Sequence, residues 1–276
     1  MDSWNSEGLV RWRRLDPLGV EIDHDLSAPL EPSAGAQLVS LLWKHGLILA
    51  RGQALPMERQ RAICSLFGPI LLRAGESGYL STVDAPAVSL SELSFHADAA
   101  YTEAPFDALA LHAVEVVDDA SSTRFIDAAA AWHSLAPQLK QALEGRELEM
   151  ISPAFDALAG RTCNDPAPVA LKRGIRPAVY VNPHNGQRCL WASELQTARI
   201  VGLDREESRH LLNRVFEQAY APERVLEHKW RNGDLVIWDN IRLQHARGPL
   251  ATAGRRVLQR VIVGTEGVIP GLPEAA

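Results

Sequence analysis

The sequence has little cysteine and no long hydrophobic run. Its 276 residues include three cysteines, Cys64, Cys163 and Cys189, which are far apart and form no CxxC pair. This spacing argues against zinc-ribbon and thioredoxin-type sites, and it favours a reduced protein. The longest apolar stretches, such as residues 47–50, are far too short to span a bilayer, and residues 1–16 contain no apolar signal-peptide core. We therefore expect a cytoplasmic protein with no membrane partner.

An excess of charge of one sign is also lacking. The 28 basic and 34 acidic residues give a net charge of −6, and no run of five like charges occurs. A dedicated nucleic-acid-binding protein would usually carry a basic face, so we expect no nucleic-acid partner. The pattern leaves self-association into a homo-oligomer open.

The chain shows no internal repeat and no Ser/Gly linker. Hydrophobic residues make up 46% of it, enough for a sizeable core. We therefore predict a single domain over residues 1–276, with a frayed tail over 265–276. Residues 69–106 and 150–175 have weak periodicity, and we predict long loops there that act as lid or specificity elements.

The predicted helices lie early in the chain and between strands. We expect one from Ser33 to about His45, stopped by Gly46, and a second from Pro56 to near Gly68. Two more are expected, over residues 127–145 with an interruption around Pro137, and over residues 205–220 with Asp204 as the cap.

The predicted strands are concentrated in the second half of the chain. They cover residues 47–50 and 107–117, both sides of the turn Asn185-Gly186, and three runs between residues 223 and 264. This order favours a mainly β fold with flanking helices, a barrel or a sandwich with the helices packed outside.

The chemistry is predicted at His96, Asp98 and His245. Side chains two apart on an extended chain point to the same side, so His96 and Asp98 can hold one ion. His245 follows an apolar strand and a turn, where a rigid scaffold can aim it inward. Two imidazoles and one carboxylate are the facial triad of non-haem iron(II) oxygenases, which leaves open positions for a 2-oxo acid and O₂.

A 2-oxo acid bound to such an ion needs a cation for its distal carboxylate, which arginine supplies by a bidentate fork. Arg255 and Arg256 follow His245 closely (255 − 245 = 10; 256 − 245 = 11). Arg260 is four residues beyond Arg256, so the two can face one side of a strand.

The order of these motifs resembles the TauD/TfdA (taurine dioxygenase) family of Fe(II)- and 2-oxoglutarate-dependent dioxygenases, over about residues 38–264. An HxD pair, a threonine, a WDN tripeptide, a distal histidine and an arginine recur in that family; here they match His96 and Asp98, Thr123, Trp238-Asp239-Asn240, His245 and Arg256.

The resemblance implies a double-stranded β-helix, a jelly-roll, cupin-like barrel with the iron inside one mouth. It also implies that Thr123 and Arg256 bind the distal carboxylate of 2-oxoglutarate, and that Arg260 meets an anionic group of the substrate.

The chain also departs from the family pattern. Ala120 and Ser121 replace two glycines before the threonine, and Leu71 stands near the position of a substrate-binding histidine. Glu92 replaces an asparagine, so we predict that Glu92 contacts the substrate, where it can meet a cation. Taurine is therefore not the expected substrate. Asp98 is retained, which favours oxygenation over halogenation.

The function predicted from the sequence is an Fe(II)- and 2-oxoglutarate-dependent dioxygenase. It would oxidise, with hydroxylation favoured, a small anionic or zwitterionic organic substrate with O₂ and release succinate and CO₂. A non-catalytic barrel that serves as a binding module, and a non-oxidative zinc or manganese enzyme on the same barrel, are the alternatives. The first would tolerate loss of His96, and the second would work without O₂ and leave the spacing of Arg256 unexplained.

Overall fold

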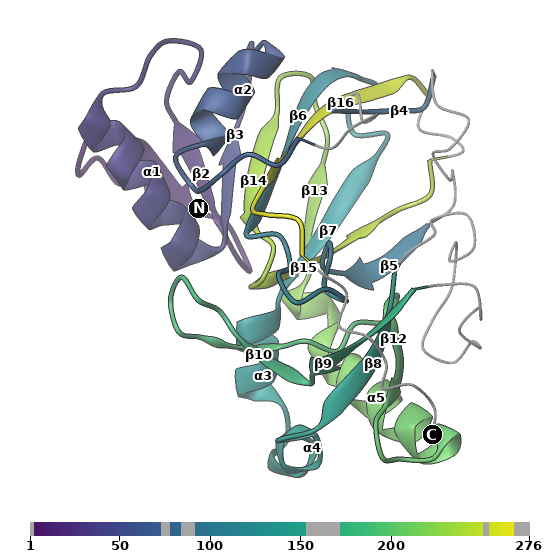
Figure 1. Ribbon diagram of the computed structural model, residues 1–276. Helices are drawn as coiled ribbons and strands as arrows, with labels where there is room; N and C mark the ends of the chain where they lie inside the picture. The colour runs from purple at the N-terminus through teal and green to yellow at the C-terminus, as the bar shows by residue number, and fades with distance from the viewer. Residues whose placement is uncertain (1–2, 73–77, 84–91, 153–171, 251–253, 268–276) are drawn as a thin grey trace.

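Two facing β-sheets form the centre of the computed structural model, which describes residues 3–72, 78–83, 92–152, 172–250 and 254–267 (Figure 1). In the described residues the larger sheet has seven strands, in the order β1 (Arg11–Arg14), β2 (Val20–Asp23), β3 (Leu47–Ala50), β14 (Leu235–Asp239), β6 (Ala108–Val116), β16 (Arg256–Val263) and β4 (Tyr79–Ser81). The smaller has four, in the order β13 (Leu226–Lys229), β7 (Ser122–Asp127), β15 (Leu243–Arg247) and β5 (Leu93–His96). Strands from the end of the chain thus lie between strands from its first half.

Helices cover the outer faces of both sheets (Figure 1). The larger sheet is covered by α1 (Pro32–His45) and α2 (Met57–Cys64). On the smaller sheet lie α3 (Ala128–Ser134), α4 (Pro137–Leu143) and α5 (Arg205–Ala219), followed by the 3₁₀ turn Pro222–Arg224. Beside them are a sheet of β12 (Thr197–Ile200), β8 (Glu147–Ile151) and β9 (Arg173–Pro177) and the hairpin of β10 (Val179–Val181) and β11 (Arg188–Leu190).

Three apolar clusters hold these layers together. One lies between the larger sheet and α1 and α2, and another between the smaller sheet and α3 to α5. The third fills the space between the sheets, where Trp238 and Leu258 of the larger sheet meet Phe125 and Leu243 of the smaller. Burial of this kind stabilises by about 25 cal/mol per Å² of apolar surface. The space between the sheets is therefore filled by packed apolar side chains, and the site described below is built on its walls.

The local signals in the sequence explain most helix and turn boundaries. Helix α1 buries one face through Leu38, Leu41 and Leu42, and it ends at Gly46, whose φ of 80° is in the left-handed region that glycine adopts readily. Asp204 caps α5 in a capping box, the break at Pro137 separates α3 from α4, and the hairpin of β10 and β11 turns at Asn185-Gly186. These predictions, and the mainly β class with flanking helices, are confirmed.

Other boundaries were predicted wrongly. The second helix ends at Cys64, well before Gly68. The stretch 69–106 was predicted as a loop, yet β4 and β5 lie within it and pair with β16 and β15. These strands are short, and their partners lie far away in the sequence, so local periodicity does not mark them. The stretch 150–175 begins and ends in strands, and residues 153–171 lie outside the described residues, as does most of the predicted tail.

Of the helices in the described parts of the chain, none combines the length and the apolar character needed to cross a membrane.

Candidate metal centre and co-substrate site

The pairing of two strands brings the predicted metal ligands together. In the register of β5 and β15, His96 lies opposite His245, and the two ring centroids are 4.2 Å apart. Asp98 follows β5 by two residues, and its Oδ1 lies 3.5 Å from Nε2 of His96 and 3.9 Å from Nε2 of His245. One ligand atom from each residue lies within 4.8 Å of the other two. The geometry therefore matches a site for one ion with three ligands.

Hydrogen bonds fix the orientation of these ligands. Nδ1 of His96 lies 2.9 Å from the backbone oxygen of Ser94, so this nitrogen donates and Nε2 is left to face Asp98. Asn240 is fully buried at the end of the WDN tripeptide. Its side chain bonds to both the amide and the carbonyl group of the Asp98 backbone. Its Oδ1 accepts from the backbone amide of Asp98, and its Nδ2 donates to the backbone oxygen of Asp98, both at 2.9 Å. Such supporting contacts orient metal ligands in proteins.

The middle residue of the tripeptide shapes the turn that delivers His245. Oδ1 of Asp239 accepts from the amides of Ile241 and Arg242, and its Oδ2 accepts from Nδ2 of Asn182 at 2.7 Å. Sequence reasoning assigned no role to Asp239. The signal was present, because an acidic residue at the end of an apolar strand is a common turn residue.

The electrostatics of Asp98 and His245 suit a divalent metal. Burial alone would raise the pKa of Asp98, but the hydrogen bond from His96 and the charges of His245, His96 and Arg260 outweigh it, so the pKa lies below its usual value. Burial, helped by His96, lowers the pKa of His245 to about 3. A carboxylate and a neutral imidazole are the states in which these groups bind metal. A two-histidine, one-carboxylate set fits iron(II).

The predicted co-substrate residues come from both sheets. Thr123, on β7 of the smaller sheet, is buried, and its Oγ1 accepts a hydrogen bond of 3.0 Å from Nε1 of Trp230. Arg256 begins β16 of the larger sheet and is only 3% exposed. Its Nε is buried and has no hydrogen-bond partner in the described part of the structure. Burial and the charge of Arg247 lower its pKa to about 10, so it remains a cation at neutral pH and fits an anion such as a carboxylate.

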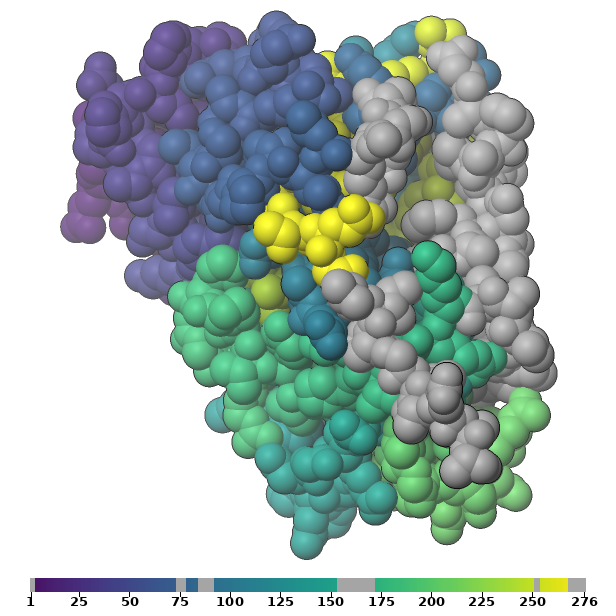
Figure 2. Space-filling view, in the orientation of Figure 1, coloured from purple at the N-terminus to yellow at the C-terminus, as the bar shows by residue number. Residues whose placement is uncertain are grey.

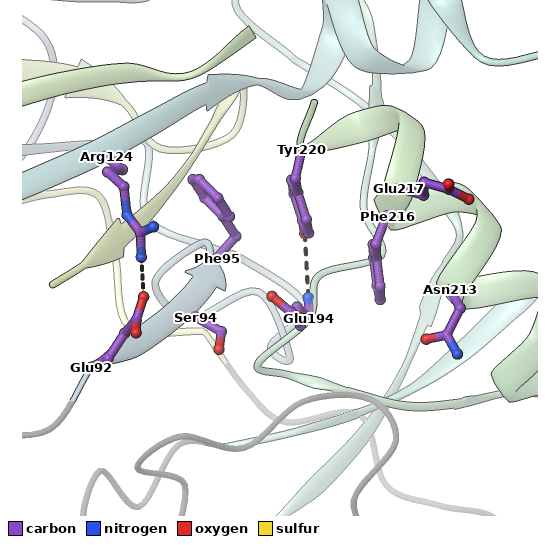
Figure 3. A pocket seen from close by; sticks show the side chains of 9 residues that line it. All are labelled: Glu92, Ser94, Phe95, Arg124, Glu194, Asn213, Phe216, Glu217 and Tyr220. Atoms are coloured by element: carbon purple, nitrogen blue, oxygen red, sulfur yellow. Dashed lines mark hydrogen bonds and ion pairs between the residues drawn. The ribbon is translucent and has the colours of Figure 1, made fainter. Parts of the chain in front are cut away.

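The two predicted substrate residues lie in different places. Arg260 lines a cavity of about 200 Å³ together with Arg61, Leu71 and Leu72, and its charge reaches Asp98 and His245. Glu92 is instead ion-paired with Arg124, at the rim of a cavity of about 430 Å³ that holds further acidic and aromatic side chains (Figure 3). Arg124 alternates with Thr123 and so leaves the other face of β7. The charge of Arg260 thus acts on two of the candidate metal ligands, whereas Glu92 lines a different cavity.

The chain is similar to known proteins in both sequence and fold. The profile described as "Taurine catabolism dioxygenase TauD, TfdA family" matches residues 11–262. Over its alignment the chain is 26% identical to an alpha-ketoglutarate-dependent 2,4-dichlorophenoxyacetate dioxygenase of Cupriavidus pinatubonensis, which covers 92% of this chain and 98% of the relative. A pentalenolactone F synthase of Streptomyces arenae is 31% identical over 55% of each chain. A taurine dioxygenase structure from Burkholderia xenovorans, 24% identical, superposes with a TM-score of 0.78 over 93% of this chain and 91% of that one.

The fold and the triad define the class of iron(II)- and 2-oxoglutarate-dependent dioxygenases on a jelly-roll scaffold. The chain belongs to the TauD/TfdA family of this class. It is therefore an enzyme, and Fe(II), 2-oxoglutarate and O₂ are its cofactor and co-substrates. The strands form two facing sheets that are not joined edge to edge in the described residues.

Proposed function

We propose that His96, Asp98 and His245 hold Fe(II), and that Arg256 and Thr123 bind the distal carboxylate of 2-oxoglutarate. The observation that carries this proposal is the convergence of three ligand atoms within 4.8 Å of one another. Arg256, a buried cation with an unsatisfied Nε, supports the second half of the proposal. We further propose that residues 1–276 act as one catalytic domain.

When bound, the iron with its chelated 2-oxo acid supplies O₂ activation: one oxygen atom goes to succinate as CO₂ leaves, and the other goes to the substrate. The protein positions the reacting groups and excludes water from the site. Asp98 offsets part of the metal charge, and the fork of Arg256 fixes the far end of the co-substrate. Trp238 and Phe125 pack beside His245, with ring centroids 5.1 and 6.4 Å from its ring, and keep water from that side.

We propose that the substrate is a small organic molecule with an anionic group next to an apolar body. Arg260 supports the anion, and the leucine side chains of its cavity support the apolar body. Relatives of the chain are named for 2,4-dichlorophenoxyacetate, phenoxypropionate and sulfate esters, which all carry such a group. The alternative prediction, a zwitterion whose cation meets Glu92, requires the ion pair of Glu92 with Arg124 to open. Hydroxylation is the reaction that we favour.

A cytoplasmic location is also proposed. Its support is that Cys64 and Cys189 are free, buried thiols, as expected in a reducing compartment.

The test is an anaerobic titration of the protein with Fe(II) and 2-oxoglutarate, followed by the visible charge-transfer absorption of the chelate. Succinate formation is then measured under O₂ with a panel of aryloxyalkanoates, alkyl sulfates and amino acids. We expect the absorption band in the wild-type protein, its loss in His96→Ala, and succinate release stimulated by an anionic substrate. A folded wild-type protein that gives neither the band nor succinate would refute the proposal.

A further inference from the structure

The hairpin of β10 and β11 meets the WDN tripeptide at a fully buried contact. Asn182 directly follows β10, and its Nδ2 donates to Oδ2 of Asp239 at 2.7 Å. Both residues are 0% exposed. A buried carboxylate oxygen that loses its donor keeps the cost of its desolvation, so this hydrogen bond is worth more than a similar one on the surface.

The orientation of the Asn182 side chain is fixed as well. Its Oδ1 accepts from the backbone amide of His184 at 2.9 Å, and its own backbone amide donates to the backbone oxygen of Gln187 at 2.8 Å. The two ends of the side-chain amide therefore cannot exchange places, because the oxygen has to accept from the hairpin. The nitrogen is left to donate to Asp239.

The tip of the hairpin is attached to the other half of the molecule. The ring of His184 stacks on Trp43 of α1, with centroids 3.8 Å apart and planes 9° from parallel. Nε2 of His184 lies 3.0 Å from Oδ1 of Asp107, the residue before β6. In Figure 1 the hairpin accordingly reaches from the helices of the smaller sheet to α1, which covers the larger sheet. The hairpin is therefore a support fixed to both halves.

The second strand of the hairpin contacts the chain next to His245. Gln244, only 3% exposed, donates from Nε2 to the backbone oxygens of Leu190, at 3.0 Å, and Ala192, at 2.9 Å. Leu190 is the last residue of β11. The hairpin thus bonds to the segment 239–245 near both of its ends, at Asp239 and at the residue before the proposed ligand.

Asp239 links Asn182 to two proposed metal ligands. Its Oδ1 accepts from the amides two and three residues later, which shapes the turn into β15 and His245. The next residue, Asn240, bonds to the backbone of Asp98. A carboxylate free to rotate at Asp239 would loosen both paths, and the bond from Asn182 holds it from outside the turn.

We infer that Asn182 is a positioning residue for the metal: by fixing the Asp239 carboxylate, it fixes where His245 and Asp98 stand. The inference rests on the proposed function, in which these two side chains bind Fe(II) together with His96. The hydrogen bonds of Asn182 go to Asp239 and to its own hairpin, so a change there reaches the metal through the turn.

The experiment compares the metal affinity of Asn182→Ala with that of the wild-type protein. Both are titrated with Fe(II) in the presence of excess 2-oxoglutarate and without O₂, and the charge-transfer band of the chelate reports binding without turnover. We expect the variant to bind Fe(II) ~10-fold more weakly, the lower end of the loss that follows removal of a contact that orients a metal ligand. The melting temperature of each metal-free protein is measured separately.

The matched control is Asn185→Ala, which removes the same kind of side chain from the same hairpin. Asn185 is exposed, and its Nδ2 donates to the backbone oxygen of Trp43. Its replacement should change the affinity for Fe(II) by less than about twofold. Asn182→Ser, a smaller change, takes the place of Asn182→Ala if the alanine variant does not fold.

A double-mutant cycle separates positioning from a general loss of structure. In Asp239→Asn the side-chain oxygen still has to accept from the two backbone amides of the turn, so a nitrogen takes the place of Oδ2 and Asn182 has no acceptor there. In that background, Asn182→Ala should change the affinity for Fe(II) by less than about twofold.

The outcomes are distinct. A lower melting temperature of the Asn182 variant with a wild-type affinity for Fe(II) would show a structural role alone and overturn the inference. A loss of affinity of the same size in the Asp239→Asn background would also overturn it, because the effect would not pass through Asp239. A wild-type protein that shows no band with Fe(II) and 2-oxoglutarate would instead overturn the proposed function itself.

Discussion

At the scale of single residues, Asn240 shows how the site depends on a side chain that binds no ligand. Its side-chain amide bonds to the backbone of Asp98 and also donates to the backbone oxygen of Phe106 at 3.0 Å. Asp98 lies beyond the end of β5, so strand pairing does not fix it. The position of the metal carboxylate therefore depends on Asn240.

We predict that Asn240→Ala lowers the affinity for Fe(II) about 10- to 100-fold, the usual cost of losing a contact that orients a metal ligand. Anaerobic metal titration measures the effect. Asn185→Ala is the control, because Asn185 is exposed and its side chain bonds to the backbone of Trp43 and Gln187 rather than to a proposed metal ligand. Equal metal affinities in the two variants would contradict this role of Asn240.

A histidine far from the metal gives a second residue-scale prediction. Burial, with the charges of Lys44, Arg14 and Arg242, lowers the pKa of His45 from 6.5 to about 4. Between these values the unfolded chain binds a proton that the folded chain does not bind. The free energy of unfolding therefore falls as the pH falls from about 6.5 to about 4.

Replacement of this histidine should flatten that dependence. His45→Gln is expected to lose less stability than the wild-type protein between pH 6.5 and pH 4.5, as measured by urea unfolding at a series of pH values. His210→Gln, a change at an exposed position on α5, should keep the wild-type slope. A slope for His45→Gln that equals the wild-type slope would disprove the assignment.

Sequence reasoning proposed His96, Asp98 and His245 as metal ligands from residue type and spacing alone, and the structure brings these three side chains together. It named Asn240 only as part of the tripeptide and gave it no role. The hydrogen bonds of Asn240 to Asp98 join residues 142 positions apart. Such a contact cannot be read from the local sequence.

At the scale of elements, α5 is defined by its ends as much as by its buried face. The side chain of Asp204 accepts from the amides of Glu206 and Glu207, and the Glu207 carboxylate accepts from the Asp204 amide. The cap satisfies amide groups that have no partner inside the helix.

Asp204→Ala should lower the free energy of unfolding by about 1 kcal/mol, the typical loss for an N-cap. Thermal or urea unfolding at neutral pH is the measurement, with the exposed Arg209→Ala on the same helix as the control. A loss no larger than that of the control would show that the cap adds little here.

The contrast between α5 and β5 explains which elements the sequence predicts. A cap and a 3.6-residue apolar pattern are local, so α1 and α5 were found with nearly correct ends. Strand β5 has four residues and exists because β15 pairs with it, some 150 positions later (245 − 96 = 149). The weak periodicity of residues 69–106 predicts a loop there, although β5 ends in the proposed ligand His96.

At the scale of the whole molecule, the proposed co-substrate site joins the two sheets. The proposed metal ligands stand on or beside the smaller sheet, and Arg256 stands on the larger. A ligand that binds only the folded state stabilises it by RT ln(1 + [L]/Kd), about 2.7 kcal/mol at one hundred times Kd.

We predict that Mn(II), used to avoid oxidation, raises the melting temperature, and that 2-oxoglutarate at one hundred times its Kd raises it further by several degrees. In Arg256→Met the metal increment should remain and the 2-oxoglutarate increment at the same concentration should be largely lost. Calorimetry of each protein alone, with Mn(II), and with Mn(II) and 2-oxoglutarate tests this. Retention of the full second increment in the variant would argue against Arg256 as the co-substrate residue.

In the proposed site, the two ends of the co-substrate are held by residues of opposite sheets. The gap between the sheets is set by the buried side chains between them, including Trp238, Phe125 and Leu258. Close-packed interiors resist changes of volume. The distance between the sheets therefore cannot adjust to the length of the bound 2-oxo acid. A diacid one carbon shorter, such as oxaloacetate, would fall short of one wall, and 2-oxoadipate, one carbon longer, would have to bend. With the proposed site residues, we expect the thickness of the core to favour a five-carbon diacid over shorter and longer ones.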